Sequence, residues 1–170
     1  MRRVFIAMIL VAAAAAPVAA QDRLEDRVVV NALVGPGFAG DATVFNMRAS
    51  AGIKANDWLA VMGEWGHLSK PNDTVISGQH INANALFTTT APVAANLRPY
   101  ATVGIGSFRT SKGIFGGGTR TDFATNLGAG VTYDVNRWLG VSFDYRRFLV
   151  DYDNVQGTNR YTVGLNVGWK

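Results

Sequence analysis

The stretch that decides the fold is Arg160-Tyr-Thr-Val-Gly-Leu-Asn-Val-Gly-Trp-Lys170 at the C-terminal end of the chain. Its side chains alternate between an apolar or aromatic set and a small or polar set. Because successive side chains of a β-strand point to opposite faces, this alternation predicts a strand with one apolar face and one polar or tightly packed face. The apolar set is Tyr161, Val163, Leu165, Val167 and Trp169, and the other set is Thr162, Gly164, Asn166 and Gly168.

The N-terminal residues have the three parts of a secretory signal peptide. Arg2 and Arg3 form a charged region, Val4–Ala16 is apolar, and the small residues Val18–Ala20 precede an expected cleavage site. The apolar run is short and rich in alanine, which argues against a membrane-spanning helix. We therefore expect residues 1–20 to be a cleaved signal peptide and the chain to be exported.

The remaining composition favours one all-β domain. We expect residues 21–26 to be a short N-terminal segment and residues 27–170 to form the domain. The chain has 19 glycines and no cysteine, so disulfides, thiolate zinc sites and cysteine nucleophiles are excluded. Loss of Arg2 and Arg3 with the signal peptide lowers the net charge from +4 to +2, because residues 1–20 contain no acidic residue. We expect no nucleic-acid partner for so mild a charge.

Eight segments read as β-strands of about ten residues, the length that a tilted strand needs to cross a bilayer. Apolar and polar residues alternate along them, and we expect the apolar set to face lipid and the polar set to face a lumen. The sequence therefore predicts an all-β fold, an eight-stranded antiparallel up-and-down transmembrane β-barrel preceded by a cleaved signal peptide. The expected strands are Arg27–Gly35, Thr43–Lys54, Trp58–Leu68, Gln79–Thr89, Pro99–Phe108, Thr121–Asp134, Trp138–Arg147 and Arg160–Trp169.

The connections between these segments alternate in length. Lys54–Trp58 and Asp134–Trp138 enclose tight turns, whereas the connections at the other end are longer and rich in Gly, Asn, Asp and Ser. Short turns at one end and long loops at the other are typical of an outer-membrane barrel. Thr90–Arg98 is an exception, because it belongs to the short-turn end but is long. The longer connections are Gly35–Ala42, Ser69–Gly78, Arg109–Arg120 and Leu149–Asn159, and Pro36, Pro71, Pro92 and Pro99 are expected in connections or at a strand start.

Aromatic residues with lipid-facing parity fall near the two ends of the expected strands. Two rows of aromatics around an aliphatic and alanine band are typical of membrane barrels, since an amphipathic ring suits the headgroup level. The expected aromatic girdle consists of Phe45, Trp65, Phe123, Tyr145 and Tyr161 at the long-loop end, and of Phe87, Tyr133 and Trp169 at the short-turn end.

The polar parity places charged and amide side chains inside the barrel. If Lys54 faces Trp58, Arg48 lies opposite Glu64, and the second tight turn places Asn126 opposite Arg146, with Asp144 two positions along. An eight-stranded barrel is narrow enough for side chains to fill it, and buried charges there must pair. We therefore expect a polar lumen network, with a gated pore that opens at the Arg48–Glu64 pair as the alternative. The expected network contains Arg48, Glu64, Asn126, Asp144 and Arg146.

The chain resembles the small outer-membrane β-barrels of Gram-negative bacteria, of the OmpA transmembrane-domain and OmpX type. The resemblance is carried by the N-terminal signal pattern and by three segments: Arg98-Pro-Tyr-Ala-Thr-Val-Gly-Ile-Gly, Asn126-Leu-Gly-Ala-Gly-Val-Thr-Tyr and Tyr161-Thr-Val-Gly-Leu-Asn-Val-Gly-Trp. It implies location in the outer membrane, contact with its lipids and lipopolysaccharide, and recognition of the final strand by the insertion machinery. In that family the final strand normally ends on an aromatic residue, whereas here Lys170 follows Trp169. We expect a monomer.

Basic residues gather toward the long-loop side of the expected barrel. Arginine binds phosphate bidentately, and the outer leaflet of such a membrane is rich in phosphate. We therefore expect lipopolysaccharide contact at Arg120 and Arg147.

Candidate catalytic and metal sites are weak. His67 and Ser69 share a face, as a base and a nucleophile require, but their parity is that of the lipid side, so we interpret His67 as a rim histidine. His80 has no second histidine on its strand to complete a metal site. Asp151, Asp153 and Asn154 are read as a solvated loop rather than a calcium site. We expect no enzyme activity, catalytic residue, metal or cofactor.

Four functions fit the sequence to different degrees. The first is a structural, surface-exposed outer-membrane barrel, with loops that contact lipid or host surfaces. The second is a small-solute pore, and the third is a lipid A-modifying enzyme. The fourth is a soluble ligand carrier of the lipocalin kind, which requires the apolar parity to point inward.

Overall fold

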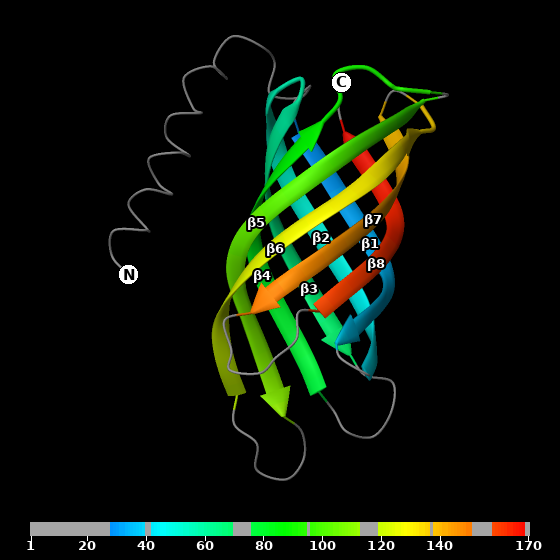
Figure 1. The fold of residues 1–170 in the computed structure, drawn as a ribbon. Helices are drawn as coiled ribbons and strands as arrows, with labels where there is room; N and C mark the ends of the chain where they lie inside the picture. The colour runs from blue at the N-terminus through cyan, green and yellow to red at the C-terminus, as the bar shows by residue number, and fades with distance from the viewer. Residues whose placement is uncertain are drawn as a thin grey trace.

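The protein is a closed antiparallel β-barrel in which each strand pairs with its sequence neighbours and β1 pairs with β8 (Figure 1). The computed structural model describes residues 28–39, 42–69, 76–94, 96–112, 119–136, 138–150 and 158–168. The eight strands are β1 (Val28–Ala39), β2 (Ala42–Asn56), β3 (Leu59–Ser69), β4 (Ile76–Thr88), β5 (Leu97–Lys112), β6 (Thr119–Asp134), β7 (Leu139–Val150) and β8 (Thr158–Gly168). None of the described residues forms a helix long and apolar enough to cross a membrane.

The two ends of the barrel differ in their connections. The short-turn end, at the top of Figure 1, carries the β2–β3, β4–β5 and β6–β7 connections. The long-loop end carries the β1–β2, β3–β4, β5–β6 and β7–β8 connections. The expected strand number and antiparallel order are confirmed.

The alternation of the sequence places polar side chains inside the barrel and apolar side chains outside. Along β3, buried and exposed residues alternate almost without exception. Arg48 and Asp144 are 5% and 1% exposed, whereas Val163 and Leu165 on β8 are 50% and 53% exposed. The expected orientation is therefore confirmed, and a soluble carrier with an apolar interior is excluded.

The tilt of the strands follows from the register of their pairing. Successive cross-strand partners lead from Val28 on β1 around the barrel to Asn159 on β8, and then to Phe38 on β1. The return point lies ten residues further along β1, and this displacement is the shear of the barrel. Strands in such barrels tilt by roughly 40°, and eight of them enclose a lumen that side chains can fill.

The two tight turns are built differently from the prediction, and this shifts the register. The side-chain Oδ1 of Asn56 accepts hydrogen bonds from the N–H groups of Trp58 and Leu59 at 3.0 and 2.9 Å, so Asn56 pairs with Leu59 and Lys54 with Ala60. Asn136 accepts two equivalent bonds at the β6–β7 turn.

The predicted cross-strand pairs are consequently wrong by two residues. Arg48 lies opposite Gly66 rather than Glu64, and Arg146 lies opposite Gly128 rather than Asn126. Because the shift is even, every side chain keeps its predicted face.

Two proline predictions also need correction. Pro36 lies inside β1, which continues to Ala39, so the expected long connection from Gly35 to Ala42 is wrong. Pro36 pairs with Phe45 of β2, and the β1–β8 ladder has no paired residue there, as expected for a residue without an N–H. Pro99 lies within β5, two residues after its first residue.

Candidate functional site

The centre of the lumen contains four charged side chains from three strands. Arg48 of β2 contacts Asp144 of β7 through Nη2 at 2.6 Å and Glu64 of β3 through Nη1 at 3.3 Å. Arg146 of β7 contacts the same Glu64 Oε2 at 2.7 Å and Asp144 Oδ1 at 3.3 Å. Each arginine therefore meets both carboxylates. We call Arg48, Glu64, Asp144 and Arg146 the ion cluster.

The ion cluster is almost completely shielded from solvent. Its side chains are between 1% and 6% exposed. Removing one member of a buried charge pair leaves an uncompensated charge, which costs several kcal/mol. These contacts cross the lumen and connect β7 to β2 and β3. Neither β2 nor β3 is adjacent to β7 in the barrel.

Neutral polar side chains extend the ion cluster. Tyr100 of β5 donates its hydroxyl to Asp144 Oδ2 at 2.7 Å. Asn126 of β6 donates to Asn84 Oδ1 of β4 at 2.9 Å. Asn126 is buried in the lumen, as expected, at 2% exposed. Its cross-strand partner on β7 is Phe148 and not the expected Arg146. The structure thus brings four of the five expected network residues into direct contact, and Asn126 bonds elsewhere in the lumen.

A second buried pair, His80 and Arg160, was not predicted as part of the network. His80 Nε2 lies 3.3 Å from Glu64 Oε1, and Arg160 Nη1 lies 3.1 Å from His80 Nδ1. The same Arg160 Nη1 lies 3.4 Å from His80 Nε2, and since a guanidinium only donates, the imidazole is the acceptor in this contact. The alternation of the sequence could have indicated that both residues face the lumen. His80 lies on the same face of its strand as Asn82, and Arg160 lies on the same face as Thr162.

Aromatic rings enclose the arginine of this pair. The Arg160 guanidinium lies 3.7 Å from the ring centroid of Phe148 and 5.7 Å from that of Phe108. Arg160 is 2% exposed, and it makes no ion pair with a carboxylate within the described part of the chain. Cation–π contact supplies a part of the stabilisation that a carboxylate would give.

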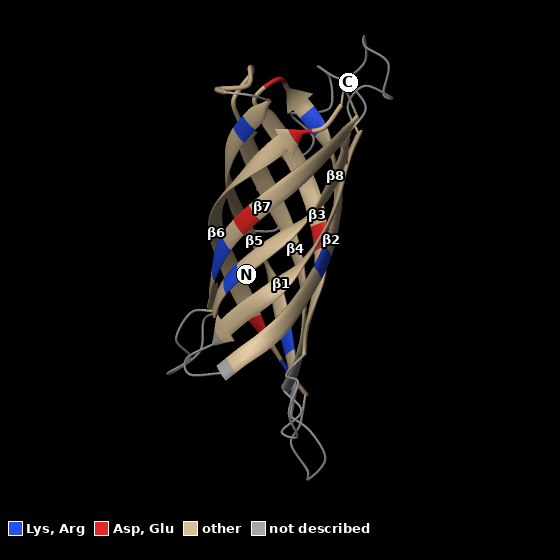
Figure 2. Cartoon of the chain, turned by 90° about the vertical axis from the view of Figure 1, so that its right-hand side faces the viewer, with Lys and Arg blue, Asp and Glu red and all other residues tan. Residues whose placement is uncertain are grey.

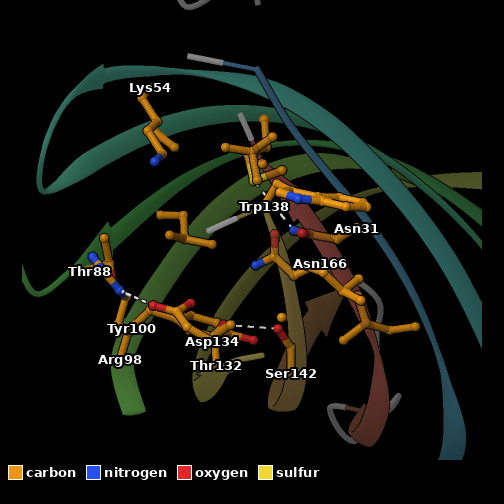
Figure 3. Close-up of a pocket in the computed structure, with 18 of the residues that line it drawn as sticks. Asn31, Lys54, Thr88, Arg98, Tyr100, Thr132, Asp134, Trp138, Ser142 and Asn166 are labelled. Carbon is orange, nitrogen blue, oxygen red and sulfur yellow. Dashed lines mark hydrogen bonds and ion pairs between the residues drawn. The ribbon is translucent and has the colours of Figure 1, made fainter. Parts of the chain in front are cut away.

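A cavity of about 110 Å³ lies between the ion cluster and the short-turn end. Figure 3 shows Asn31 and Asn166, which are cross-strand partners, on one side of it and the Arg98–Asp134 ion pair on another. Thr132 and Ser142 share a hydrogen bond of 2.9 Å. Arg48 and Arg146 line the inner end of the cavity, so the ion cluster separates it from the long-loop half of the lumen. Figure 2 shows that acidic and basic positions are sparse along the strands.

The aromatic residues expected to form the girdle lie on the outer wall where they are described. Trp169 lies outside the described residues. Tyr145 is half-buried, because its hydroxyl bonds to Asn159 Oδ1 at 2.9 Å and its ring packs against Tyr161. Trp58, which was not in the expected set, stacks on Phe87 with ring centroids 6.0 Å apart. The exposed members of the expected set are Phe45, Trp65, Phe87, Phe123, Tyr133 and Tyr161.

The remaining candidates lie toward the long-loop end. Arg120 makes an ion pair with Asp122 at 2.7 Å, whereas Arg147 is exposed on the outer wall of β7. His67 is half-buried with outward parity, opposite Gln79. The described residues contain no group of three side chains suited to a metal ion, and residues 151–154 lie outside them.

Comparison with known families identifies the class of protein that this fold and filled lumen define. The model of the outer membrane protein beta-barrel domain matches residues 5–170. The chain therefore belongs to this family, and it is a barrel of the Gram-negative outer membrane. No curated protein sequence matches it.

Solved structures of small outer-membrane barrels share the fold. Neisserial surface protein A is 20% identical with a TM-score of 0.68, covering 84% of this chain and 96% of its own. The N-terminal β-barrel domain of OprF from Pseudomonas aeruginosa is 16% identical with a TM-score of 0.62, covering 84% and 97%. Ail of Yersinia pestis, the attachment invasion locus protein, is 12% identical with a TM-score of 0.54, covering 83% and 95%. At these identities the likeness concerns the fold.

Proposed function

We propose that the protein is a structural, surface-exposed integral barrel of the outer membrane whose lumen is closed by its own side chains. The observation that carries this proposal is the ion cluster, in which Arg48 and Arg146 each contact Glu64 and Asp144 across the lumen. A pore requires a continuous water-filled path. Here buried side chains occupy the middle of the barrel, and Phe108 and Phe148 pack around His80 beyond them.

Electrical recording tests this proposal directly. The purified barrel is reconstituted into planar bilayers, and single-channel conductance is recorded in about 1 M KCl. A reconstituted porin is the positive control. We expect insertion without conductance steps. Regular, reproducible steps from the wild-type barrel would favour the alternative function, a small-solute pore.

One observation favours that alternative. The cavity at the short-turn end already extends from the turn residues to Arg146. Among the described residues, the ion cluster and the aromatic contacts of His80 lie between this cavity and the long-loop end. Loss of the Arg48 and Glu64 side chains would therefore shorten the part of the lumen that side chains fill. A double substitution of Arg48 and Glu64 to alanine that leaves the bilayer silent would exclude the ion cluster as a gate.

For partners, we propose contact of the outer wall with membrane lipid, and of Arg147 with lipopolysaccharide phosphate. Arg147 is exposed on the outward face of β7, near the aromatic pair Tyr145 and Tyr161. Arg120 is a weaker candidate than the sequence implied, since Asp122 already neutralises its charge. R147A should reduce co-purified lipopolysaccharide more than R120A, and equal retention by both variants would remove the assignment.

We further propose that the barrel acts as a monomer without enzyme activity and that β8 carries the signal for the insertion machinery. His67 and Ser69 lie on the outer wall, opposite Gln79 and Phe45 respectively, and no hydrogen bond to a side chain of the described residues orients the histidine. Unchanged lipid A mass spectra after expression would support the absence of lipid-modifying activity, and a new lipid A species would contradict it.

A further inference from the structure

The buried charged side chains of the lumen do not sum to zero. Three arginines and two carboxylates are buried among the described residues: Arg48, Arg146, Arg160, Glu64 and Asp144. The ion cluster pairs two of the arginines with both carboxylates, so no carboxylate is left for Arg160. Buried charges in proteins are normally paired, because water no longer solvates them. One positive charge therefore remains uncompensated in the part of the lumen that the structure describes.

The groups in contact with Arg160 do not supply a negative charge. Its Nη1 lies 3.1 Å from His80 Nδ1, and a histidine side chain is either neutral or positive. The guanidinium also lies over the ring of Phe148, with the ring of Phe108 further away. Aromatic faces attract a cation, but they carry no net charge. The charge of Arg160 is thus only partly balanced by its neighbours.

One edge of the Arg160 guanidinium is free to bind a further group. Nε and Nη2 are buried and have no hydrogen-bond partner among the described residues. These two nitrogens belong to a planar group whose N–H donors have a fixed fork geometry, which suits an anion that accepts two hydrogen bonds at once. Buried donors without a partner are rare in native proteins, and bound water or an ion is a common explanation.

Two further unpaired polar groups lie on the adjoining inner wall. Thr162 is two residues from Arg160 on the same face of β8 and is 2% exposed, and Asn46 of β2 is completely buried. Thr162 Oγ1 and Asn46 Nδ2 have no hydrogen-bond partner. Gly35 of β1 separates them, since it pairs with Asn46 and a Cβ on it would lie 2.9 Å from Thr162 Cα. This stretch of wall therefore presents donors with no side chain between them.

We infer that Arg160 binds a small monovalent anion of the size of chloride inside the long-loop half of the lumen. Nε and Nη2 of Arg160 donate to the ion, and Thr162 and Asn46 provide donors on the adjoining wall. A single negative charge brings the sum of the buried charges to zero. A small ion is required because side chains fill a barrel of eight strands. The ion binds as the barrel folds, so the inference holds whether or not the lumen conducts.

The dependence of stability on chloride tests this inference. The unfolding of the barrel by urea is measured in lipid vesicles at constant ionic strength, with chloride progressively replaced by gluconate, an anion too large for the site. A ligand that binds only the folded state raises the folding equilibrium constant in proportion to one plus its concentration divided by Kd. Above Kd, we expect about a tenfold rise for each tenfold increase in chloride. Equal stability in chloride and gluconate would overturn the inference.

Two substitutions separate the buried site from a general effect of salt. R160M removes the proposed ligand of the ion, whereas R109M removes the same charge from an exposed position on β5. Heat-dependent gel migration verifies that both variants are folded. We expect R160M to lose the dependence on chloride and R109M to retain it. A dependence that persists in R160M would overturn the inference.

Crystals of the wild-type barrel grown with bromide in place of chloride locate the ion without a substitution. We expect an anomalous peak at hydrogen-bond distance from Arg160 Nε and Nη2. A peak for water alone, without anomalous signal, would contradict the inference. An anomalous peak combined with equal stability in chloride and gluconate would show binding at crystal concentration only, and it would also overturn the inference.

Discussion

Arg48 Nη1 lies 3.3 Å from Glu64 Oε2 although the two residues are not cross-strand partners. The residue opposite Arg48 is Gly66, which has no side chain to occupy the inner wall. Arg48 therefore reaches Glu64 diagonally and meets Asp144 from the far side of the barrel. The stability of the lumen consequently depends on side chains from three strands at once.

The first prediction concerns the carboxylate that both arginines share. E64Q removes the charge that Arg48 and Arg146 contact and leaves two buried guanidinium groups with Asp144 alone. We expect a loss of about 3 kcal/mol in the free energy of unfolding, since breaking a buried charge pair costs that much. Urea unfolding in lipid vesicles, followed by tryptophan fluorescence, measures it. D57N, at an exposed turn position, is the control, and equal midpoints for both variants would contradict the prediction.

The second prediction separates the two kinds of buried arginine. R160M should be close to neutral or stabilising, because Arg160 has no carboxylate partner among the described residues and a methionine preserves the packing against Phe148. R146M should destabilise by about 3 kcal/mol, since it leaves two buried carboxylates, Glu64 and Asp144, with Arg48 as their one remaining arginine in the ion cluster. The same unfolding assay compares them. A larger loss for R160M than for R146M would show that the His80 contact matters more than charge pairing.

The third prediction uses two glycines on β3. A Cβ at Gly66 would lie 2.0 Å from His80 Cε1, whereas a Cβ at Gly63 would meet nothing nearer than 3.8 Å. G66A should displace the His80 ring and cost about 1–3 kcal/mol by overpacking. G63A should be neutral or slightly stabilising, since alanine loses less conformational freedom than glycine on folding. The folded fraction on semi-native gels at rising temperature measures both, and similar profiles would argue against a tightly packed His80.

The fourth prediction tests the lipid-facing wall. Leu127 is 63% exposed in the middle of β6, and Val135 is 52% exposed just beyond the end of that strand. L127R should destabilise the barrel by about 2–4 kcal/mol in a bilayer, whereas V135R should cost about 0–1 kcal/mol. Reversible unfolding from vesicles compares the two free energies. An equal, small cost for both would mean that Leu127 does not face acyl chains.

Much of the barrel was predictable because its alternation has a period of two. Leu165 and Val163 point outward and Asn166 inward, as their parity requires, and an even shift in the pairing register leaves these faces unchanged. The register itself was not predictable from the turns. Asn56 and Asn136 bind backbone N–H groups within their turns, which moves each partner by two residues. The prediction ended the first strand before Pro36, but β1 continues through it. The strand accommodates this proline because the β1–β8 ladder has no paired residue at that position.

The sequence by itself determined which side chains face lipid and which face the lumen, because each residue's side depends only on its position along its own strand. Only the tertiary structure decided which side chains contact one another inside the lumen. The shear of ten residues brings Glu64 within reach of Arg146, 82 residues away, and places His80 between Glu64 and Arg160. Contacts across a closed cylinder depend on the tilt and register of all eight strands together, and no local pattern specifies these.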